Sequence, residues 1–177
     1  MTIDIKYPKI VVFDLDYTLW PCWCDTHISK PIKSLNPSTI IDSNHFKISF
    51  YKDVPKILHE LNSAGVIIAT ASRTCDPQIA KKMLKLLKLK NGDGDGDDLI
   101  SAYDIIDHME WGTFSKINHL KKIASRFKVD YREMVLFDDE LRNKDVESKL
   151  GVKFIHIADE SIGLTYDVFL RGLKNRD

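Results

Sequence analysis

Two aspartates and a threonine, Asp14, Asp16 and Thr18, follow an apolar run near the amino end of the chain. The run, residues 10–13, reads Ile-Val-Val-Phe and is typical of a buried strand. A carboxylate at the end of such a strand is costly unless something balances its charge. Carboxylate oxygens are ligands that Mg²⁺ prefers. The pattern therefore indicates a metal-dependent site for phosphoryl transfer.

Polar residues also follow the later apolar runs. Ser72 and Arg73 follow the second run, Asp138 and Asp139 follow a later one, and Lys116 opens a predicted helix. In a parallel α/β sheet these positions meet at one edge. A carboxylate there can attack phosphorus, a cation removes the repulsion between the two anions, and a second carboxylate can protonate the leaving oxygen. Ser72 and Lys116 can bind phosphate oxygens.

The elements that must position these residues alternate between strands and helices. Buried strands are predicted at residues 9–13, 66–71, 134–137 and 152–157, with a fainter fifth at 103–107. Helices are predicted at residues 53–63, 76–87, 115–127 and 140–150, with a last one at 161–173. The alternation predicts a doubly wound α/β fold, a mainly parallel sheet with helices on both faces. We expect a single domain over residues 1–177.

Two segments depart from this alternation. Residues 21–51 separate the first strand from its helix by about thirty positions, where two to six are usual, and are expected to form a loop or flap beside the site. Residues 91–98 read Asn-Gly-Asp-Gly-Asp-Gly-Asp-Asp. Counted from Asp93, a calcium loop of the EF-hand type would need glycine at position 6 and glutamate at position 12, where the chain has Asp98 and Asp104, so a solvated acidic loop is expected.

The composition limits the partners and the compartment. The 177 residues carry 26 basic and 26 acidic side chains, a zero net charge that gives no reason to expect nucleic acid or membrane as a partner. The three cysteines are too few and too irregularly spaced for a disulfide framework. We see no leader or membrane-spanning stretch and expect a cytoplasmic protein, with entry into the nucleus and the oligomeric state left open.

The motifs resemble those of the haloacid dehalogenase (HAD) superfamily, whose DxDxT signature residues 14–18 match. The longer string over residues 13–21 resembles a narrower group, the small eukaryotic magnesium-dependent phosphatases. Further matches, in the expected order, are Thr26-His27, Ser72-Arg73-Thr74, Lys116, Phe137-Asp138-Asp139-Glu140 and Asn143. The resemblance covers nearly the whole chain and implies a Rossmann-like fold.

The resemblance implies a role for each acidic residue. Asp14 would be the nucleophile, forming an aspartyl-phosphate, and a Mg²⁺ ligand. Asp16 would be the general acid and later the base that activates water, with its backbone carbonyl on the metal. Asp138 would be the third protein ligand of the metal. Asp139 would act through a metal-bound water, with Asn143 holding the geometry.

The same resemblance implies how substrate is bound. Ser72 would bind a phosphoryl oxygen, Lys116 would anchor the intermediate, and Arg73 would reach the substrate phosphate through its guanidinium. Trp20 is expected at the substrate mouth. Members of this group lack a large cap domain, as this chain does, and act on phosphotyrosine-containing protein and on phosphorylated sugars such as fructosamine phosphates. The sequence does not choose between these substrates.

Each of these residues also has an ordinary structural interpretation. Asp138 and Asp139 could cap a helix, Lys116 could be a solvated helix residue, and Arg73 could form a structural ion pair. The aromatic and imidazole side chains of the insertion could line the mouth or pack the insertion onto the body; these are Trp20, Trp23, His27, Phe46 and Tyr51.

The motifs and their order disfavour two other function classes. A receiver domain also accepts phosphate on an aspartate beside an acidic pair and a lysine, but its acidic pair lies on the first strand, whereas here Asp138-Asp139 comes late. An inactive binding module would not need Asp14, Asp16, Ser72 and Lys116 together.

Overall fold

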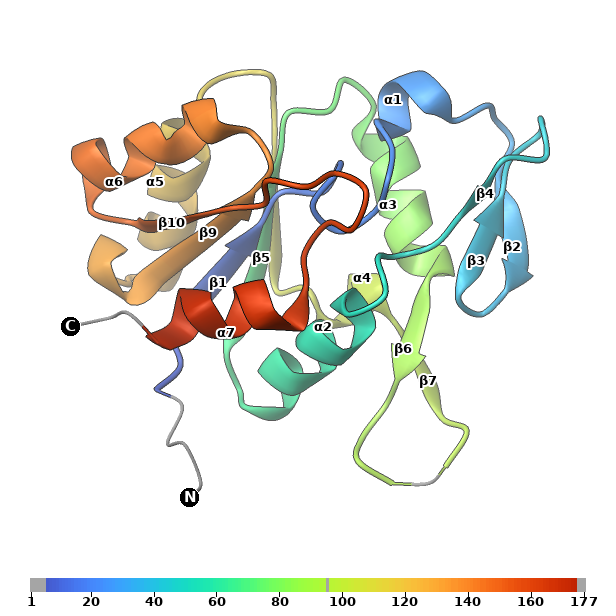
Figure 1. Cartoon of the computed structure of the whole chain (residues 1–177), viewed down its shortest axis with the longest axis horizontal. Helices are drawn as coiled ribbons and strands as arrows, with labels where there is room; N and C mark the ends of the chain where they lie inside the picture. Colours follow the sequence, from blue (N-terminus) through green and yellow to red (C-terminus); the bar gives the residue numbers. More distant parts are fainter. Residues whose placement is uncertain (1–5, 95, 175–177) are drawn as a thin grey trace.

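A computed structural model of the chain describes residues 6–94 and 96–174. Its centre is a five-stranded parallel sheet in the order β10-β9-β1-β5-β8 (Figure 1). The strands are β1 (Ile10–Phe13), β5 (Ile67–Ser72), β8 (His108–Trp111), β9 (Met134–Asp138) and β10 (Lys153–His156). The order places β1 in the middle, so the residues after it lie between those that follow β5 and β9.

Alternate side chains of β1 serve two separate hydrophobic cores. Val11 and Phe13 face one core, which is completed by the helices α2 (Val54–Ser63), α3 (Pro77–Leu86) and α7 (Tyr166–Lys174). Ile10 and Val12 face the other, which is completed by α5 (Lys116–Phe127) and α6 (Asp145–Leu150). A strand covered on both faces needs apolar residues without alternation, and β1 has them at every position.

Local sequence signals set the starts of the helices. The Asp76 carboxylate accepts a hydrogen bond of 3.1 Å from the Ile79 amide at the start of α3, next to Pro77. The Ser115 hydroxyl accepts one of 3.2 Å from the Ile117 amide and caps α5. That cap fixes Lys116 at the first turn of α5, above the carboxyl ends of the strands.

Four of the five predicted strands are confirmed, and the fifth is wrong. Residues 103–107 do not form a strand, because the Ser101 side chain accepts a hydrogen bond from the Asp104 amide and starts the short helix α4 (Ala102–Ile105). The fifth strand is β8, which begins at His108. As an edge strand with half-buried residues, β8 lacks the apolar run that marks the inner strands.

The predicted helices are present with shifted ends. The segment expected as one helix over 140–150 is a 3₁₀ turn, η2 (Leu141–Lys144), followed by α6, and a second 3₁₀ turn, η1 (Tyr131–Glu133), precedes β9. The last helix, α7, begins at Tyr166 rather than at residue 161. No helix within the described parts of the chain is long and apolar enough to cross a membrane.

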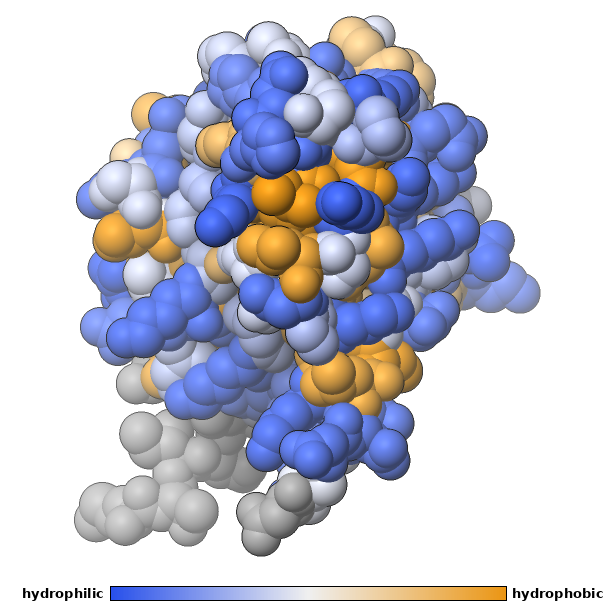
Figure 2. Space-filling view, turned by 90° about the vertical axis from the view of Figure 1, so that its right-hand side faces the viewer, coloured by the Kyte–Doolittle hydropathy of each residue, from blue (hydrophilic) through white to orange (hydrophobic). Residues whose placement is uncertain are grey.

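The insertion after β1 folds into a small unit of its own. It contains α1 (Cys24–His27) and a three-stranded antiparallel sheet of β2 (Lys33–Asn36), β3 (Thr39–Ile41) and β4 (Lys47–Ile48). Figure 2 looks onto this side of the molecule and shows apolar side chains gathered between charged ones. The insertion carries a few short elements and no large cap domain, as predicted.

The acidic segment 91–98 joins two strands, not two helices. It connects β6 (Lys88–Lys90) to β7 (Leu99–Ser101), which pair as an antiparallel hairpin. An EF-hand needs a helix on each side of its loop, so the hairpin favours the interpretation as a solvated loop. Residue 95, within this segment, and residues 1–5 and 175–177 of the expected domain lie outside the described residues.

Gly163 tests how tightly the insertion packs on the body. Its φ is +58°, and an added Cβ would lie 2.0 Å from Cδ2 of Tyr51, whose hydroxyl donates to the Glu160 carbonyl. Gly163→Ala is expected to lower the free energy of unfolding by about 3 kcal/mol, since backbone strain and a ring clash add. Urea denaturation measures the change.

Gly151→Ala is the matched control for this substitution. Gly151 ends α6 with φ +85°, but an added Cβ there has no atom within 4 Å, so only the backbone strain remains, about 1 kcal/mol. Equal losses in the two variants would show that Tyr51 gives way and that the packing is loose.

Candidate active site

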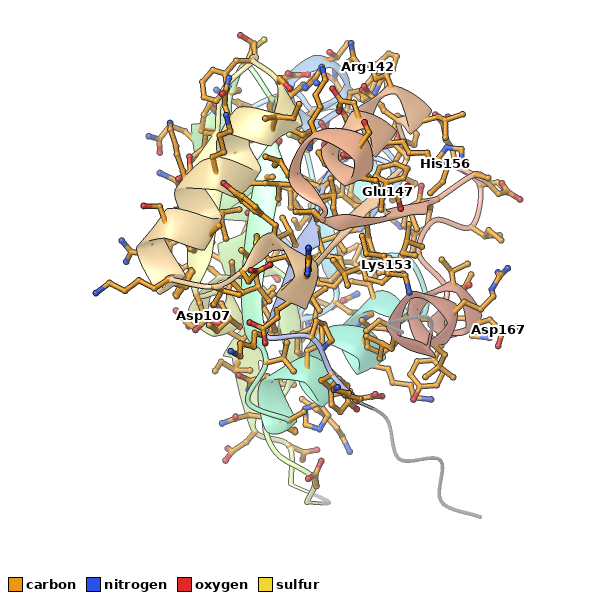
Figure 3. All side chains as sticks on the ribbon, turned by 90° about the vertical axis from the view of Figure 1, so that its left-hand side faces the viewer. Asp107, Arg142, Glu147, Lys153, His156 and Asp167 are labelled. Carbon is orange, nitrogen blue, oxygen red and sulfur yellow. The ribbon has the colours of Figure 1, made fainter. Side chains whose placement is uncertain are left out.

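The sheet brings the predicted site residues together at the carboxyl ends of its strands. Asp14 follows β1, Ser72 ends β5 and Asp138 ends β9. The Asp14 amide donates a hydrogen bond of 2.9 Å to the Phe137 carbonyl, which ties the nucleophile candidate to the neighbouring strand. Figure 3 shows Arg142 at this end of the molecule and Asp107, which accepts from the amide at the start of β5, at the opposite end.

Three carboxylates form the centre of the site. One oxygen each from Asp14, Asp138 and Asp139 lie within 4.8 Å of one another. Burial raises the pKa of Asp14 to about 7 and the pKa values of Asp138 and Asp139 to about 6. Neighbouring carboxylates add to the rise of each. The donor atoms are all carboxylate oxygens that lie close together, and burial disfavours their ionised form when no cation is present. Such a set of ligands fits a hard divalent cation such as Mg²⁺.

Lys116 lies among these carboxylates. Its Nζ donates to Asp14 Oδ1 at 2.7 Å, lies 3.2 Å from Asp138 Oδ2, and also donates to the Ala71 carbonyl. Only 2% of the side chain is exposed. Burial alone would lower the pKa of Lys116, but the charges of the two aspartates outweigh it and raise the pKa. The lysine is therefore a buried, permanent cation, and the interpretation of it as a solvated helix residue is wrong.

Asn143 connects the acidic centre to Arg73. Its Nδ2 donates to Asp138 Oδ2 at 2.9 Å, and its Oδ1 accepts from Nη2 of Arg73 at 2.9 Å. The amide is 1% exposed, so both groups depend on it for orientation. Asn143 thus holds the Asp138 carboxylate in place. The Arg73 guanidinium lines the cavity at the site.

Asp16 lies in the same cavity but apart from the three clustered carboxylates. Its Oδ1 accepts from Trp20 Nε1 at 2.7 Å and from the Cys24 amide at 3.1 Å. Burial raises the pKa of Asp16 in spite of these hydrogen bonds, which favour the ionised form. A carboxyl group that is held by fixed donors and has a raised pKa suits an acid that must give up a proton and take one back.

Trp20 is predicted to lie at the substrate mouth, but the structure buries it. The side chain is fully buried, its ring stacks on Phe50 with centroids 6.1 Å apart, and it does not line the cavity. The ring can be buried because its single N–H has a hydrogen-bond partner, the partly buried Asp16 carboxylate. Trp20 therefore positions Asp16.

The cavity has a volume of about 240 Å³ and opens to solvent. It is lined by Asp14, Asp16, Trp23, Asp25, Thr26, Ser72, Arg73, Thr74, Asp139, Glu140 and Arg142. Asp25 ties the insertion to the loop after β5, because its Oδ2 accepts from the Cys75 amide at 2.8 Å and from Thr74 Oγ1 at 3.2 Å. The insertion is therefore a wall of the site.

The remaining aromatic side chains of the insertion differ in their roles. Trp23 lines the cavity and stacks on His27. Tyr51 is buried, and its hydroxyl donates to the Glu160 carbonyl, so it packs the insertion onto the body. Phe46 is exposed but does not line the cavity. Residues that the sequence did not single out as site residues include Asp25, Glu140 and Arg142.

Comparisons with known proteins agree with this geometry. The chain matches the profile of the Acid Phosphatase family over residues 6–177. The chain belongs to this family. It is 45% identical over 157 residues to a HAD-like hydrolase superfamily protein of Schizosaccharomyces pombe, covering 88% of each chain. It is 36% identical over 169 residues to magnesium-dependent phosphatase 1 of Homo sapiens, covering 96% of this chain and 87% of the human one.

Solved structures support the fold of this family member. The amino-terminal part of a Bacteroides fragilis protein, which contains a phosphatase domain complexed with Mg, superposes with a TM-score of 0.61 at 18% identity. The match covers 99% of this chain and 45% of that one. This superposition confirms the Rossmann-like fold. The resemblance to the HAD superfamily is confirmed by the Schizosaccharomyces pombe relative, which is named as a member.

The charge balance at Lys116 can be tested by Lys116→Met. The substitution leaves Asp14 and Asp138 buried without their cation, so the free energy of unfolding in metal-free buffer at pH 7 is expected to fall by about 3 kcal/mol. The loss should shrink at pH 5, where both carboxyl groups bind protons. Urea denaturation at the two pH values measures it.

Lys121→Met, an exposed position on the same helix, is the control and should change stability by less than ~0.5 kcal/mol. A Lys116→Met variant no less stable than this control would show that the aspartates do not need the ammonium group.

Proposed function

We propose that this protein is a Mg²⁺-dependent phosphomonoester hydrolase that works through an aspartyl-phosphate on Asp14. One observation carries the proposal. The Asp14 carboxylate lies on a cavity wall between a buried cation, Lys116, and the paired carboxylates Asp138 and Asp139, with a second carboxyl group, Asp16, in the same cavity. The human relative, named a magnesium-dependent phosphatase, supports the same reaction class.

The cofactor is Mg²⁺, which Asp14, Asp138 and Asp139 fit by their donor chemistry. The backbone carbonyl of Asp16 is a further proposed ligand. When bound, the ion neutralises the phosphate and the attacking carboxylate, so that two anions can meet. The Mg-bound structural neighbour supports this choice of metal.

The proposed reaction has two displacements at phosphorus. In the first, an Asp14 oxygen forms a bond to phosphorus as the ester P–O bond breaks, and Asp16 gives its proton to the leaving oxygen. In the second, water attacks the phosphoryl group, the bond to Asp14 breaks, and Asp16 takes the proton from the water. Ser72, Arg73 and Lys116 bind the non-bridging oxygens and hold the group in line.

The substrate is proposed to be a phosphotyrosine-containing protein or a phosphorylated sugar such as a fructosamine phosphate. The open mouth supports a bulky substrate, since the insertion forms one wall and the cavity still opens to solvent. Ranking kcat/KM over phosphotyrosyl peptides, sugar phosphates and ketosamine phosphates tests this. The family assignment disfavours the receiver and the inactive module.

A cytoplasmic location is proposed as well. Two of the three cysteines, Cys22 and Cys24, are buried free thiols, which suits a reducing compartment. Fluorescence microscopy of the tagged protein tests this location, and staining confined to a secretory compartment would contradict it.

Asp14→Asn is expected to abolish turnover of p-nitrophenyl phosphate, because an uncharged amide is a poor nucleophile and cannot form the acyl-phosphate linkage. The Asp14→Asn protein should keep the wild-type circular dichroism spectrum. Acid quench of the wild type with ³²P-labelled substrate should trap a phosphoenzyme that Asp14→Asn lacks. Measurable steady turnover in a folded Asp14→Asn variant would remove Asp14 as the nucleophile.

Asp16→Asn is the matched comparison for this experiment. It leaves the nucleophile intact and removes the acid, so kcat should fall by roughly 10²- to 10⁴-fold without reaching zero. A substrate with a good leaving group, such as p-nitrophenyl phosphate, should lose less than an alkyl phosphate, since its leaving oxygen needs less help from a proton.

Magnesium affinity is expected to rise with pH. The metal competes with protons for carboxyl groups whose raised pKa values are about 7 for Asp14 and about 6 for Asp138 and Asp139. Affinity should therefore increase by at least ~10-fold from pH 5.5 to pH 7.5 and level off above the pKa of Asp14. Isothermal titration calorimetry measures it; constant affinity over this range would contradict the assignment of these ligands.

A further inference from the structure

One wall of the catalytic cavity is apolar. Among the described residues that line it, Trp23 is the single hydrophobic side chain, and all the others are charged or hydroxyl-bearing. Half of the Trp23 side chain, 50%, is exposed, although tryptophan usually buries most of its surface. A large indole face left open inside a polar cavity is a surface suited to an apolar part of the substrate.

The indole ring is held in a fixed orientation. It stacks on His27 with ring centroids 5.3 Å apart and planes 15° apart, and it meets the Tyr17 ring edge-on at 5.7 Å. The Trp23 amide donates to Nδ1 of His27 at 3.0 Å, and the Trp23 carbonyl accepts from the His27 amide at 2.8 Å. A ring supported in this way loses little freedom when a ligand stacks on it.

Trp23 lies on the side of the cavity where the leaving group must be. The next residue, Cys24, donates its amide to Asp16 Oδ1, the proposed acid that protonates the leaving oxygen. The group attached to that oxygen therefore extends along the part of the wall formed by residues 23–26. Asp14, which is paired with Lys116, is the residue proposed to attack the phosphoryl group.

The polar groups near Trp23 are already paired with each other. Asp25 accepts from the Cys75 amide and the Thr74 hydroxyl through Oδ2, and from the Thr26 hydroxyl through Oδ1 at 2.9 Å. Farther along the rim, Glu140 and Arg142 form an ion pair with each other. The carboxylate of Asp25 is thus engaged within the protein, and the indole face of Trp23 is the apolar surface left open beside it.

We propose that Trp23 is the specificity-determining residue of this site and that it selects flat aromatic leaving groups by stacking. The proposal rests on the phosphatase function proposed above. Of the two substrate classes proposed above, it favours the aryl phosphates. The indole face would stack on the ring of an aryl phosphate, such as a phosphotyrosyl side chain, while Asp16 protonates the phenolic oxygen. Aromatic pairs prefer such offset contacts.

The test compares three substrates: phenyl phosphate, cyclohexyl phosphate, which has a saturated ring of the same size, and a hexose 6-phosphate. Trp23→Ala should lower kcat/KM for phenyl phosphate about tenfold, relative to its effect on the other two, because one stacking contact is lost. The loss should appear mainly in KM, since the contact exists before and during the reaction. Trp23→Phe should stay within ~3-fold of the wild type on phenyl phosphate, because it keeps an aromatic face.

Phe46→Ala is the matched control, since Phe46 is a similarly exposed aromatic residue of the insertion outside the cavity. Its kcat/KM values should equal those of the wild type on all three substrates. Thermal melts of each variant show whether the fold is kept.

The outcomes separate the proposal from its alternatives. An equal loss on all three substrates would make Trp23 a structural residue, and no loss, or a greater loss on the hexose phosphate, would exclude aryl selection. Each of these results overturns the inference while the phosphatase activity stands. A wild-type protein that hydrolyses none of the substrates with Mg²⁺ present would instead overturn the proposed function itself.

Discussion

The architecture of this protein depends on one buried ammonium group. Lys116 bonds to Asp14, to Asp138 and to the carbonyl of Ala71, so a single cation from α5 joins residues at the ends of β1, β9 and β5. Three buried charges close together are costly unless each has a partner of opposite sign or a hydrogen bond. The strand order provides these partners, because it places β1 between β9 and β5 and so brings the ends of the three strands together around Lys116. The fold and the chemistry therefore share the same constraint.

The sequence was informative wherever burial is complete. The inner strands have apolar residues at consecutive positions, and the acids that end them stand out against that background, so the sheet and the residues Asp14, Asp138 and Lys116 could be predicted. The edge strand β8 could not be predicted, because its half-buried sequence His-Met-Glu-Trp has no such run. Ser101 is a helix-capping residue that can be seen in the sequence, but the apolar residues of α4 favour a strand in the sequence pattern and hide this signal.

The direction in which a side chain points could also not be predicted from the sequence. Trp20 and Trp23 lie three positions apart in one loop, and nothing in their types says which points inward. The structure decides it by hydrogen bonding: the Trp20 N–H finds the Asp16 carboxylate, whereas Trp23 stacks on His27 and faces the cavity. Asp25 was missed for a similar reason, because its partners, Thr74 and Cys75, are about fifty residues away.

Asn143 connects the motif that contains Arg73 to the motif that contains Asp138. Its amide joins Arg73, on the proposed phosphate-binding loop, to Asp138, a proposed metal ligand, through two hydrogen bonds of 2.9 Å. A movement of the guanidinium toward an incoming anion must alter the orientation of the amide, and with it the field at Asp138. Thermodynamic reciprocity then requires that, if the anion alters the affinity for the ion through this amide, the ion alters the affinity for the anion by the same factor. Asn143 is therefore the side chain through which the two proposed ligands would be coupled.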